Sequence, residues 1–317
     1  MKIEFSDINK HLDNLNEKDL LDTIDIIKCP YCNNKNFIKN GFYTGIQRYK
    51  CKSIKCNKTF SKKTHTLNYY SKKPPSIWMK YLYLMNLGYS LRDCSSILNI
   101  SLSTCFFWRH KILLSEKKKT TPITLKEYIE VNNIVIKENR KGTKNLTSLE
   151  RPKIFIFSGI DINKEIYSKV LYKNSTNLYS LTKIMYKFID KGAYISNFGN
   201  NIISAFTKNH NKHLKKPKKL EHLSLTFNNS PSYSKGVLFH VHKDYISNFS
   251  INIFNWLRRF KGVATKYIEN YLSWYILDFK ESYNLKDLNS VTLFKNLFIY
   301  RSFIKISIIK NTKPLHL

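Results

Sequence analysis

The sequence predicts an α+β protein of several domains, and three observations lead to this interpretation. Four of the six cysteines lie between residues 29 and 56, hydrophobic residues then recur with helical spacing up to residue 117, and strand-like alternation begins near residue 123. The 317 residues suffice for about two domains. We divide the chain into an N-terminal helical segment (1–27), a cysteine module (28–66), a three-helix unit (72–117), an α/β domain (123–278) and a tail without a readable motif (279–317).

The composition favours a folded protein that binds a polyanion. Hydrophobic residues make up 42% of the chain and aromatic residues 14%, which argues against disorder. Lys and Arg number 54 against 22 Asp and Glu, a net charge of +32, and nucleic acid is the polyanion that a basic protein most often meets. A basic surface without such a role is the alternative. No apolar run approaches the ~20 residues of a membrane span, and the polar start lacks a signal-peptide core. We therefore expect no membrane partner and a cytoplasmic or nucleoid-associated protein.

The cysteine module has the spacing of a structural zinc site. Cys29 and Cys32 form one pair and Cys51 and Cys56 a second, and four thiolates suit a closed tetrahedral zinc site with no position left for a substrate. Gly41 and Gly45 can turn a hairpin between the pairs, with FIKNGFY and IQRYK as its strands. The second spacer is longer than usual, with four residues instead of two. The remaining cysteines, Cys94 and Cys105, are interpreted as core residues.

The three-helix unit predicts a helix-turn-helix module for double-stranded DNA. In SLRDCSSILNISLSTCFFWRHKILL one helix ends near Leu98, a turn follows, and Ser101 can cap the next helix. Such a second helix enters the major groove with its first residues at base edges, while basic groups contact phosphates. The candidate DNA contacts are Arg92, Ser103, Thr104, Arg109, His110 and Lys111. An ordinary helical hairpin packed on the next domain is the alternative, and assembly of several copies on DNA is left open.

From residue 123 onward the pattern is that of strands and helices in alternation. YIEVNNIVIKE, KIFIFSGIDI and EIYSKVLYK read as strands, NLYSLTKIMYKFIDKG as a helix, and AYISNFG as a short strand. Residues 209–236 are basic and loop-like, and residues 244–278 are again helical in pattern. Two adjacent asparagines, Asn132 and Asn133, interrupt the first strand, where asparagine is usually depleted.

Several of these segments together resemble a known family. RYKCKSIKCNKTFS, KKPPSIWMKYL and SLRDCSSILNISLSTCFFWRHKIL are similar, in this order, to the N-terminal half of zinc-ribbon insertion-sequence transposases, the ISXO-like group related to the eukaryotic Merlin elements. NWLRRFKGVATKYIENYLSWY, residues 255–275, is similar to the C-terminal signature of that family. The resemblance implies an RNase H-like domain with a mixed central sheet from about residue 123. It also implies DNA transposition with two Mg²⁺ or Mn²⁺ ions held by acidic residues.

The positions that the resemblance assigns to those acids are neutral here. The first falls on Asn132, the second on Asn197 and the third on Ser247 or Asn248, with Phe254 or Asn255 where the family has a lysine. An Asn carbonyl can ligate a hard cation, but it forfeits the charge attraction that holds Mg²⁺. We therefore expect Mg²⁺ or Mn²⁺ to bind poorly and strand transfer to be lost.

Three interpretations follow. The first is a DNA-binding member of the family without strand transfer, and the second an active transposase with a rearranged metal site. Acids available for such a site are Glu130, Glu138, Asp161 and Asp244. The third is a regulator that binds element ends. If the assignment is right, the side chains of Asn132 and Asn197 should lie within several Å of each other, at adjacent points of the central sheet and near the helix of residues 244–258. Surface asparagines produced by AT-rich drift are the alternative.

Overall fold

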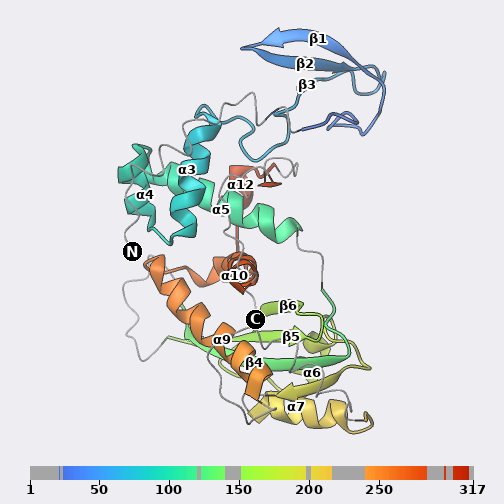
Figure 1. Cartoon of the computed structure of the whole chain (residues 1–317), viewed down its shortest axis with the longest axis vertical. Helices are drawn as coiled ribbons and strands as arrows, with labels where there is room; N and C mark the ends of the chain where they lie inside the picture. The colour runs from blue at the N-terminus through green and yellow to red at the C-terminus, as the bar shows by residue number, and fades with distance from the viewer. Residues whose placement is uncertain are drawn as a thin grey trace. The chain divides into compact units, whose positions relative to one another are not determined.

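The computed structural model divides the chain into two compact units (Figure 1). The first comprises the described residues of Met1–Lys119 and Asn284–Asn311, and the second those of Thr120–Tyr283 and Thr312–Leu317. The described residues are 21, 24–119, 123–139, 151–197, 201–215, 240–283, 296–297 and 303–313. The predicted N-terminal helix, most of the basic region 209–236 and most of the tail lie outside them. Within these ranges, no helix combines the length and apolar character needed to cross a membrane.

The first unit begins with a small antiparallel sheet. Its strands are β1 (Phe37–Tyr43), β2 (Ile46–Cys51) and β3 (Thr59–Ser61), paired in that order. Thr44 and Gly45 join β1 to β2 with φ angles of 48° and 76°, the left-handed pair that a two-residue hairpin turn requires. The rings of Phe37, Tyr49 and Phe60 pack together as the core of this sheet. The predicted hairpin is confirmed.

Three helices follow: α3 (Pro75–Asn86), α4 (Leu91–Leu98) and α5 (Leu102–Lys119). Pro75 opens α3, and a capping box between Ser90 and Asp93 opens α4. Asn99 ends α4 in the left-handed conformation, so the turn to α5 is short. Trp78 and Trp108 stack with their ring centroids 3.9 Å apart, which fixes α3 on α5. Cys94 and Cys105 are fully buried, so their interpretation as core residues is confirmed.

A short C-terminal helix, α12 (Ile306–Lys310), belongs to the same unit. It packs on α5, and the ring of Phe303 just before it lies 5.3 Å from that of Tyr69. The side chain of Lys310 lies over the ring of Phe107. Part of the tail that carried no readable motif therefore completes the first unit.

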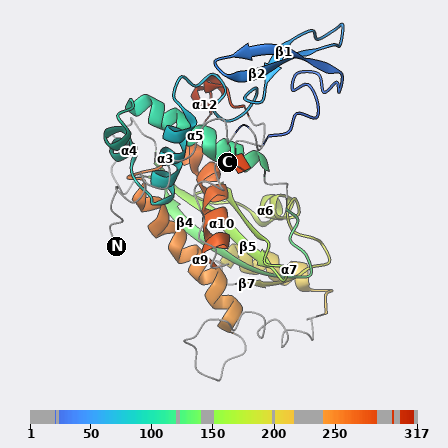
Figure 2. The same ribbon diagram turned by 45° about the horizontal axis from the view of Figure 1, so that its top comes forward.

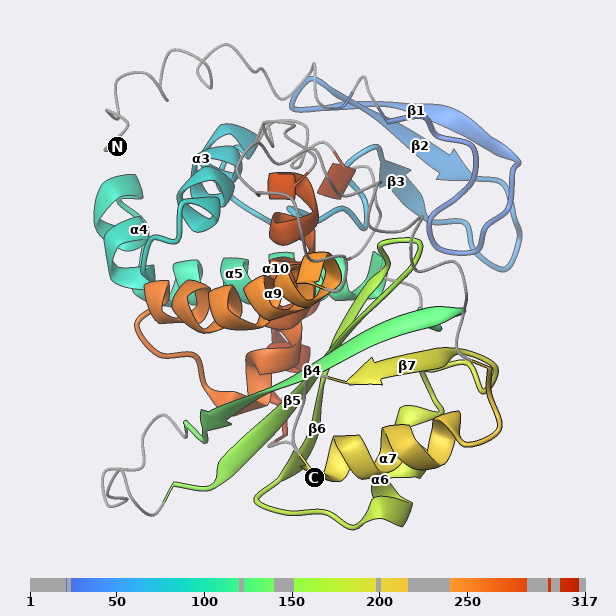
Figure 3. The same ribbon diagram turned by 60° about the horizontal axis from the view of Figure 1, so that its bottom comes forward.

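The second unit contains a four-stranded mixed sheet (Figure 3). Its strands are β4 (Tyr128–Lys137), β5 (Lys153–Asp161), β6 (Ile166–Lys173) and β7 (Tyr194–Asn197), in the spatial order β6-β5-β4-β7. β5 runs antiparallel to both of its neighbours, β4 and β6, whereas β7 runs parallel to β4. The predicted α+β class with a mixed central sheet is confirmed.

Helices cover both faces of this sheet (Figures 2 and 3). α6 (Leu178–Met185) and α7 (Asn201–Asn211) lie on one face, where a core is formed by side chains of both strands and helices, among them Ile129, Val131, Ile195, Ile203 and Phe206. α9 (His240–Arg259) and α10 (Ile268–Tyr283) lie on the other, where α9 packs on β4 and α10 on β6. Because alternate residues of a strand point to opposite faces, Glu130 and Asn132 belong to the α9 face.

Candidate metal centre and nucleic-acid interface

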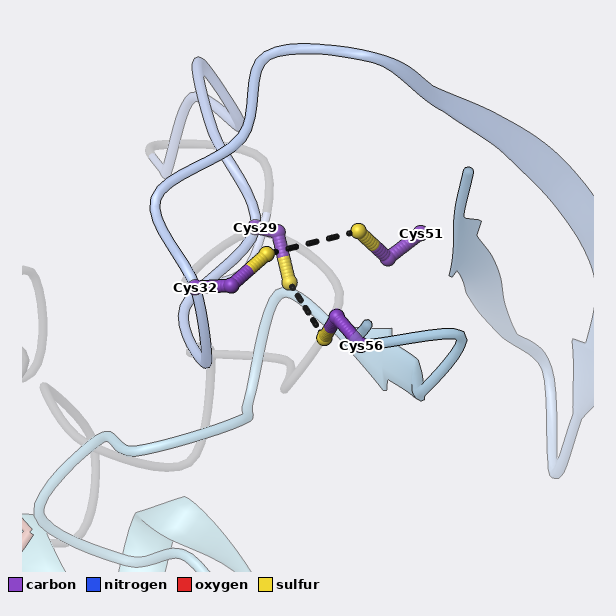
Figure 4. Close-up of side chains that lie close together, drawn as sticks. All are labelled: Cys29, Cys32, Cys51 and Cys56. Carbon is purple, nitrogen blue, oxygen red and sulfur yellow. Dashed lines mark hydrogen bonds between the residues drawn. The ribbon is translucent and has the colours of Figure 1, made fainter. Parts of the chain in front are cut away.

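The four clustered cysteines converge on one point (Figure 4). Their Sγ atoms all lie within 4.8 Å of one another, with 3.9 Å between Cys29 and Cys56 and 3.5 Å between Cys32 and Cys51. A tetrahedral zinc ion with Zn–S bonds of about 2.3 Å needs neighbouring sulfurs about 3.8 Å apart. All four are free thiols. The cluster can therefore hold a tetrahedral metal ion, and its four donors leave no open coordination position.

Each cysteine pair sits on a tight turn followed by a left-handed residue. Asn33, directly after Cys32, has a φ of 60°, and Asn57, directly after Cys56, has a φ of 44°. Asparagine adopts this conformation more readily than other residues with a side chain. In the second pair, the amide N–H of Cys56 donates to the carbonyl of Ser53 at 3.0 Å. This extra turn accommodates the long spacer.

Backbone amides and apolar side chains support the sulfurs. Amides of the turn residues approach the thiols: those of Tyr31 and Cys32 reach Cys29, and that of Asn34 reaches Cys32. Such contacts favour thiolates and orient them toward a metal. Cys29 and Cys51 are buried against the aromatic core of the sheet. The geometry is that of a structural centre, because a metal ion would join two turns that few other buried side chains hold together.

The predicted helix-turn-helix contacts fall into two groups, and the first is accessible. Arg92 is exposed in the first turn of α4, and Ser103 is exposed in the first turn of α5. The hydroxyl of Ser101 accepts the amide N–H of Thr104 at 3.1 Å, so the predicted cap is present. The Ser101 hydroxyl also shares hydrogen bonds with the hydroxyls of Ser103 and Thr104. The accessible start of α5 thus carries polar groups able to reach base edges.

The second group is buried, which corrects the prediction that it contacts phosphates. Arg109 is only 1% exposed, and its guanidinium donates to the carbonyl of Tyr89 at 2.7 Å. His110 is 3% exposed and lies edge-on to the ring of Phe106. Arg109 lies three residues before the buried Ile112 and His110 three residues before the buried Leu113, so each falls on a packed side of α5. Arg109 and His110 are therefore structural residues.

Lys111, the next residue of α5, is half-buried. Burial lowers the pKa of its ammonium group, and its Nζ lies 5.9 Å from the ring centroid of Phe303. This contact ties α5 to the C-terminal segment of the same unit. A contact between Lys111 and a phosphate stays a prediction, because this side chain keeps part of its surface exposed, unlike Arg109.

The first unit also contains a long basic segment without acidic residues, which the net charge of the whole chain does not reveal. Between residues 26 and 92 the chain contains 14 Lys and Arg and not one Asp or Glu. Many of these side chains are exposed: Lys28, Lys35, Lys39, Lys52, Lys55, Lys58, Lys72, Lys73 and Arg92. The missing acids, more than the number of bases, distinguish this segment in a chain that is basic throughout. Its field attracts polyanions without local compensation.

The asparagines of the second unit lie at neighbouring points of the sheet. Val131, next to Asn132, is the register partner of Asn197 on the parallel strand β7. The side chain of Asn197 donates to the hydroxyl of Ser204 on α7, on the face occupied by Val131. Asn132 belongs to the opposite face, and its side-chain oxygen accepts the amide N–H of Asn133 at 2.8 Å. The expected adjacency is confirmed for the backbone, whereas the expectation that the two side chains approach each other is wrong, because they lie on opposite faces of the sheet.

The third assigned position is only partly visible. Ser247 and Asn248 lie on α9, which packs on β4 as expected, but their side chains are outside the described residues. Asp244, one of the acids available for a rearranged site, is outside them for the same reason. These positions stay predictions.

The other acids weighed for a rearranged site have structural surroundings. The Asp161 carboxylate accepts the amide N–H groups of Asn163 and Glu165 at 2.9 and 3.0 Å, which forms the turn from β5 to β6. Glu138 forms an ion pair with Lys173 at 3.0 Å. Glu130 is 3% exposed, and burial raises its pKa to about 8. Among the described residues, the four cysteines are the only group of His, Cys, Asp or Glu side chains arranged to hold a metal ion.

No protein-family model and no curated protein matches this chain, so these comparisons assign it to no family.

Proposed function

We propose that this chain is a DNA-binding protein of the zinc-ribbon insertion-sequence transposase type that has lost strand transfer. In this proposal Cys29, Cys32, Cys51 and Cys56 hold one structural zinc ion, which the donor set and the convergence of the four sulfurs support. The three helices that follow would form the helix-turn-helix module, with Ser103 and Thr104 toward base edges and Arg92 toward a phosphate.

The observation that carries DNA binding is the acid-free segment of residues 26–92, with its exposed lysines. Each phosphate that a Lys or Arg neutralises releases condensed counterions, so a surface of this kind gains affinity for DNA of any sequence. Sequence preference would then come from the short polar side chains at the start of α5, since such groups read base edges.

The second unit supports the family part of the proposal through its sheet. A mixed sheet with helices on both faces is the arrangement expected of an RNase H-like domain, and β4 and β7, which carry the two assigned positions, are parallel neighbours within it. By resemblance the family has acids at these two positions, but here the side chain of Asn197 lies on the α7 face of the sheet and that of Asn132 on the α9 face, so at most one of the two can stand where an ion ligand would be.

Loss of strand transfer is supported by the charge at those positions. Two-metal catalysis relies on carboxylates that offset the ion charges, whereas an Asn side chain is neutral. Glu130 stands two residues from Asn132 on the same face, but with a pKa of about 8 its carboxyl group is mostly protonated at neutral pH. A protein that binds element ends without cutting them would act as a regulator of the element, which is the third interpretation above.

Salt-dependent binding tests the proposal. The affinity of the zinc-loaded full-length protein for duplex DNA, measured by fluorescence anisotropy over a series of KCl concentrations, should fall steeply and linearly on a double-logarithmic plot. The duplexes should include the DNA that flanks the gene, together with a scrambled control. Binding that is absent, or insensitive to salt, would refute the proposal.

A further inference from the structure

The tip of the β1–β2 hairpin exposes two adjacent aromatic rings. Phe42 is 69% exposed and Tyr43 is 68% exposed. Scattered exposed hydrophobic residues are normal on a protein surface. Two neighbouring rings on the protruding turn of a basic hairpin are less common, and they cost solubility unless they are covered in use.

The hairpin holds these rings in a defined position. Thr44 and Gly45 form the two-residue turn, and Phe42 pairs with Gln47 across the ladder while Tyr43 pairs with Ile46. The strands contain an irregularity between Lys39 and Phe42, where Gly41 has a φ of 66°. The side-chain amide of Gln47 donates to the carbonyl of Gly41 at 2.9 Å, which ties the irregular strand to its partner. Strand pairing and hydrogen bonds therefore fix the conformation of the tip.

The two rings point in opposite directions. Successive residues of a strand alternate between the two faces, so Phe42 occupies one face of the hairpin tip and Tyr43 the other. A single flat protein surface could cover one ring only. On DNA, one ring can enter a base step, as single apolar side chains do, while the other packs against the groove beside it.

The positive charge around the tip favours an acidic partner. Lys39 is exposed on β1, Arg48 and Lys50 are half-buried on β2, and the segment of residues 26–92 contains no acid. An acidic polymer is attracted to such a hairpin, and the major groove of DNA is wide enough for a two-stranded β-ribbon. Proteins that bind nucleic acids often place aromatic rings, which stack on bases, next to basic side chains, which contact phosphates, and the hairpin tip has both.

We propose that the β1–β2 hairpin is a second DNA contact, in which one of the two tip rings, Phe42 or Tyr43, inserts at a base step of the duplex, the other packs in the groove beside it, and Lys39, Arg48 and Lys50 contact phosphates. This inference rests on the proposed function, because it assigns a role in the same DNA complex. It adds a partly unstacked base step at the tip, in addition to contacts by α4 and α5. The zinc centre would then serve as the rigid base from which the hairpin reaches the DNA.

The test compares the wild-type protein with a Phe42→Ala/Tyr43→Ala variant. Both side chains are exposed, so zinc content and thermal unfolding should be unchanged, and neither substitution changes the charge. We expect the affinity for duplex DNA to fall by at least about tenfold, because stacking on a base contributes appreciably to binding. The slope of affinity against salt should stay the same. Ile54→Ala is the matched control: Ile54 is 98% exposed in the same module but lies away from the tip, and its loss should change nothing.

A second measurement reports insertion directly. Duplexes with 2-aminopurine at successive positions should brighten on binding wild-type protein, because this base fluoresces more strongly when it is unstacked, and should not brighten with the double variant. Equal affinity and equal fluorescence for both proteins would overturn the inference and leave DNA binding intact. Loss of affinity without any fluorescence change in the wild type would overturn insertion, and loss of self-association instead of DNA affinity would make the tip a contact between copies. Failure of the wild-type protein to bind DNA would refute the proposed function itself.

Discussion

Two regions of this chain carry positions at which metal ions would be expected, and they differ in what they offer. The cysteine cluster presents four sulfurs within 4.8 Å of one another on turns shaped to hold them. The sheet of the second unit presents Asn132 and Asn197 at neighbouring points of two parallel strands, where the family resemblance implies acids. The first region has the full donor set of its proposed metal, whereas the second has neutral oxygens.

The difference shows that a fold can be kept when metal-binding residues are replaced, provided that those residues do not also hold the fold together. The sheet needs its apolar face, with Val131 and Ile195 in the core, whatever the neighbouring polar residues are. The cysteine turns have no comparable core, so removing a sulfur there would remove structure as well as metal. We therefore expect substitutions at the cysteines to be severe and substitutions at the sheet asparagines to be mild.

The largest effect is expected for Cys32→Ser. Structural zinc contributes on the order of 10 kcal/mol to the folding of small zinc modules, so loss of one ligand should release the ion and unfold the residues around β1–β3. Elemental analysis should give roughly one zinc per chain for the wild type and none for the variant. Cys105→Ala, which removes a buried cysteine outside the cluster, is the control and should keep its metal. Equal zinc content in the wild type and in Cys32→Ser would contradict the claim that the four cysteines hold the metal ion.

A smaller effect is expected from the titration of Glu130. Burial holds the pKa of its carboxyl group at about 8 in the folded protein, against an ordinary value of 4.5. Between those two pH values the folded protein keeps a proton that the unfolded chain releases, so the free energy of unfolding falls as pH rises from about 4.5 to about 8. The loss amounts to at most roughly 5 kcal/mol.

Glu130→Gln should remove most of that pH dependence. The variant should match the wild type in urea unfolding near pH 5 and exceed it in stability near pH 9, because the amide is neutral throughout. An identical fall in stability with pH for both proteins would contradict a neutral carboxyl at this position. That outcome would reopen Glu130 as a charged ligand of a rearranged site.

Arg109→Ala should destabilise the first unit without weakening its electrostatic attraction to DNA. The side chain is buried and donates to the carbonyl of Tyr89, so its loss should cost about 3 kcal/mol in denaturant unfolding. The salt slope of DNA binding, measured where the variant is still folded, should be unchanged. A lower slope at full stability would restore Arg109 as a phosphate contact.

The smallest effects belong to the exposed helix-turn-helix positions. Arg92→Ala should lower the salt slope by about 0.9, the contribution of one phosphate contact, and should leave stability unchanged. Ser103→Ala should leave the slope unchanged and alter preference among sequences by roughly 1 kcal/mol or less. These changes can be read in parallel anisotropy titrations. If both variants had the same salt slope and the same sequence preference as the wild type, the proposal that α4 and α5 contact DNA would be contradicted.

Much of the fold could be predicted from the sequence, because its signals were local. Cysteine spacing, the Thr44–Gly45 turn and the Ser101 cap each follow from the chemistry of a few consecutive residues. Strand alternation likewise predicted the sheet in which Val131 pairs with Asn197. Such features depend little on how distant segments pack.

The errors concern side-chain direction and distant packing. Arg109 is charged, and only the packing of α5 against the other helices shows that it is buried. Asn132 and Asn197 lie at neighbouring backbone positions, but the register partner of Asn197 is Val131, so the side chains of the two asparagines lie on opposite faces of the sheet. The return of Phe303 to the first unit depends on contacts more than 230 residues apart in sequence, such as that with Tyr69, and no local pattern announces them.

The central claim is that this protein binds DNA without cutting it, and a strand-cleavage assay tests that claim most directly. Zinc-loaded wild-type protein should be incubated with end-labelled duplexes that contain the DNA flanking the gene, with Mg²⁺ or Mn²⁺ added, while binding is followed in the same samples. The account predicts a bound complex and no cleavage or joining above the protein-free control with either ion. Metal-dependent cleavage by the wild-type protein that is lost in Glu130→Gln would contradict the account and show an active site rebuilt around that residue.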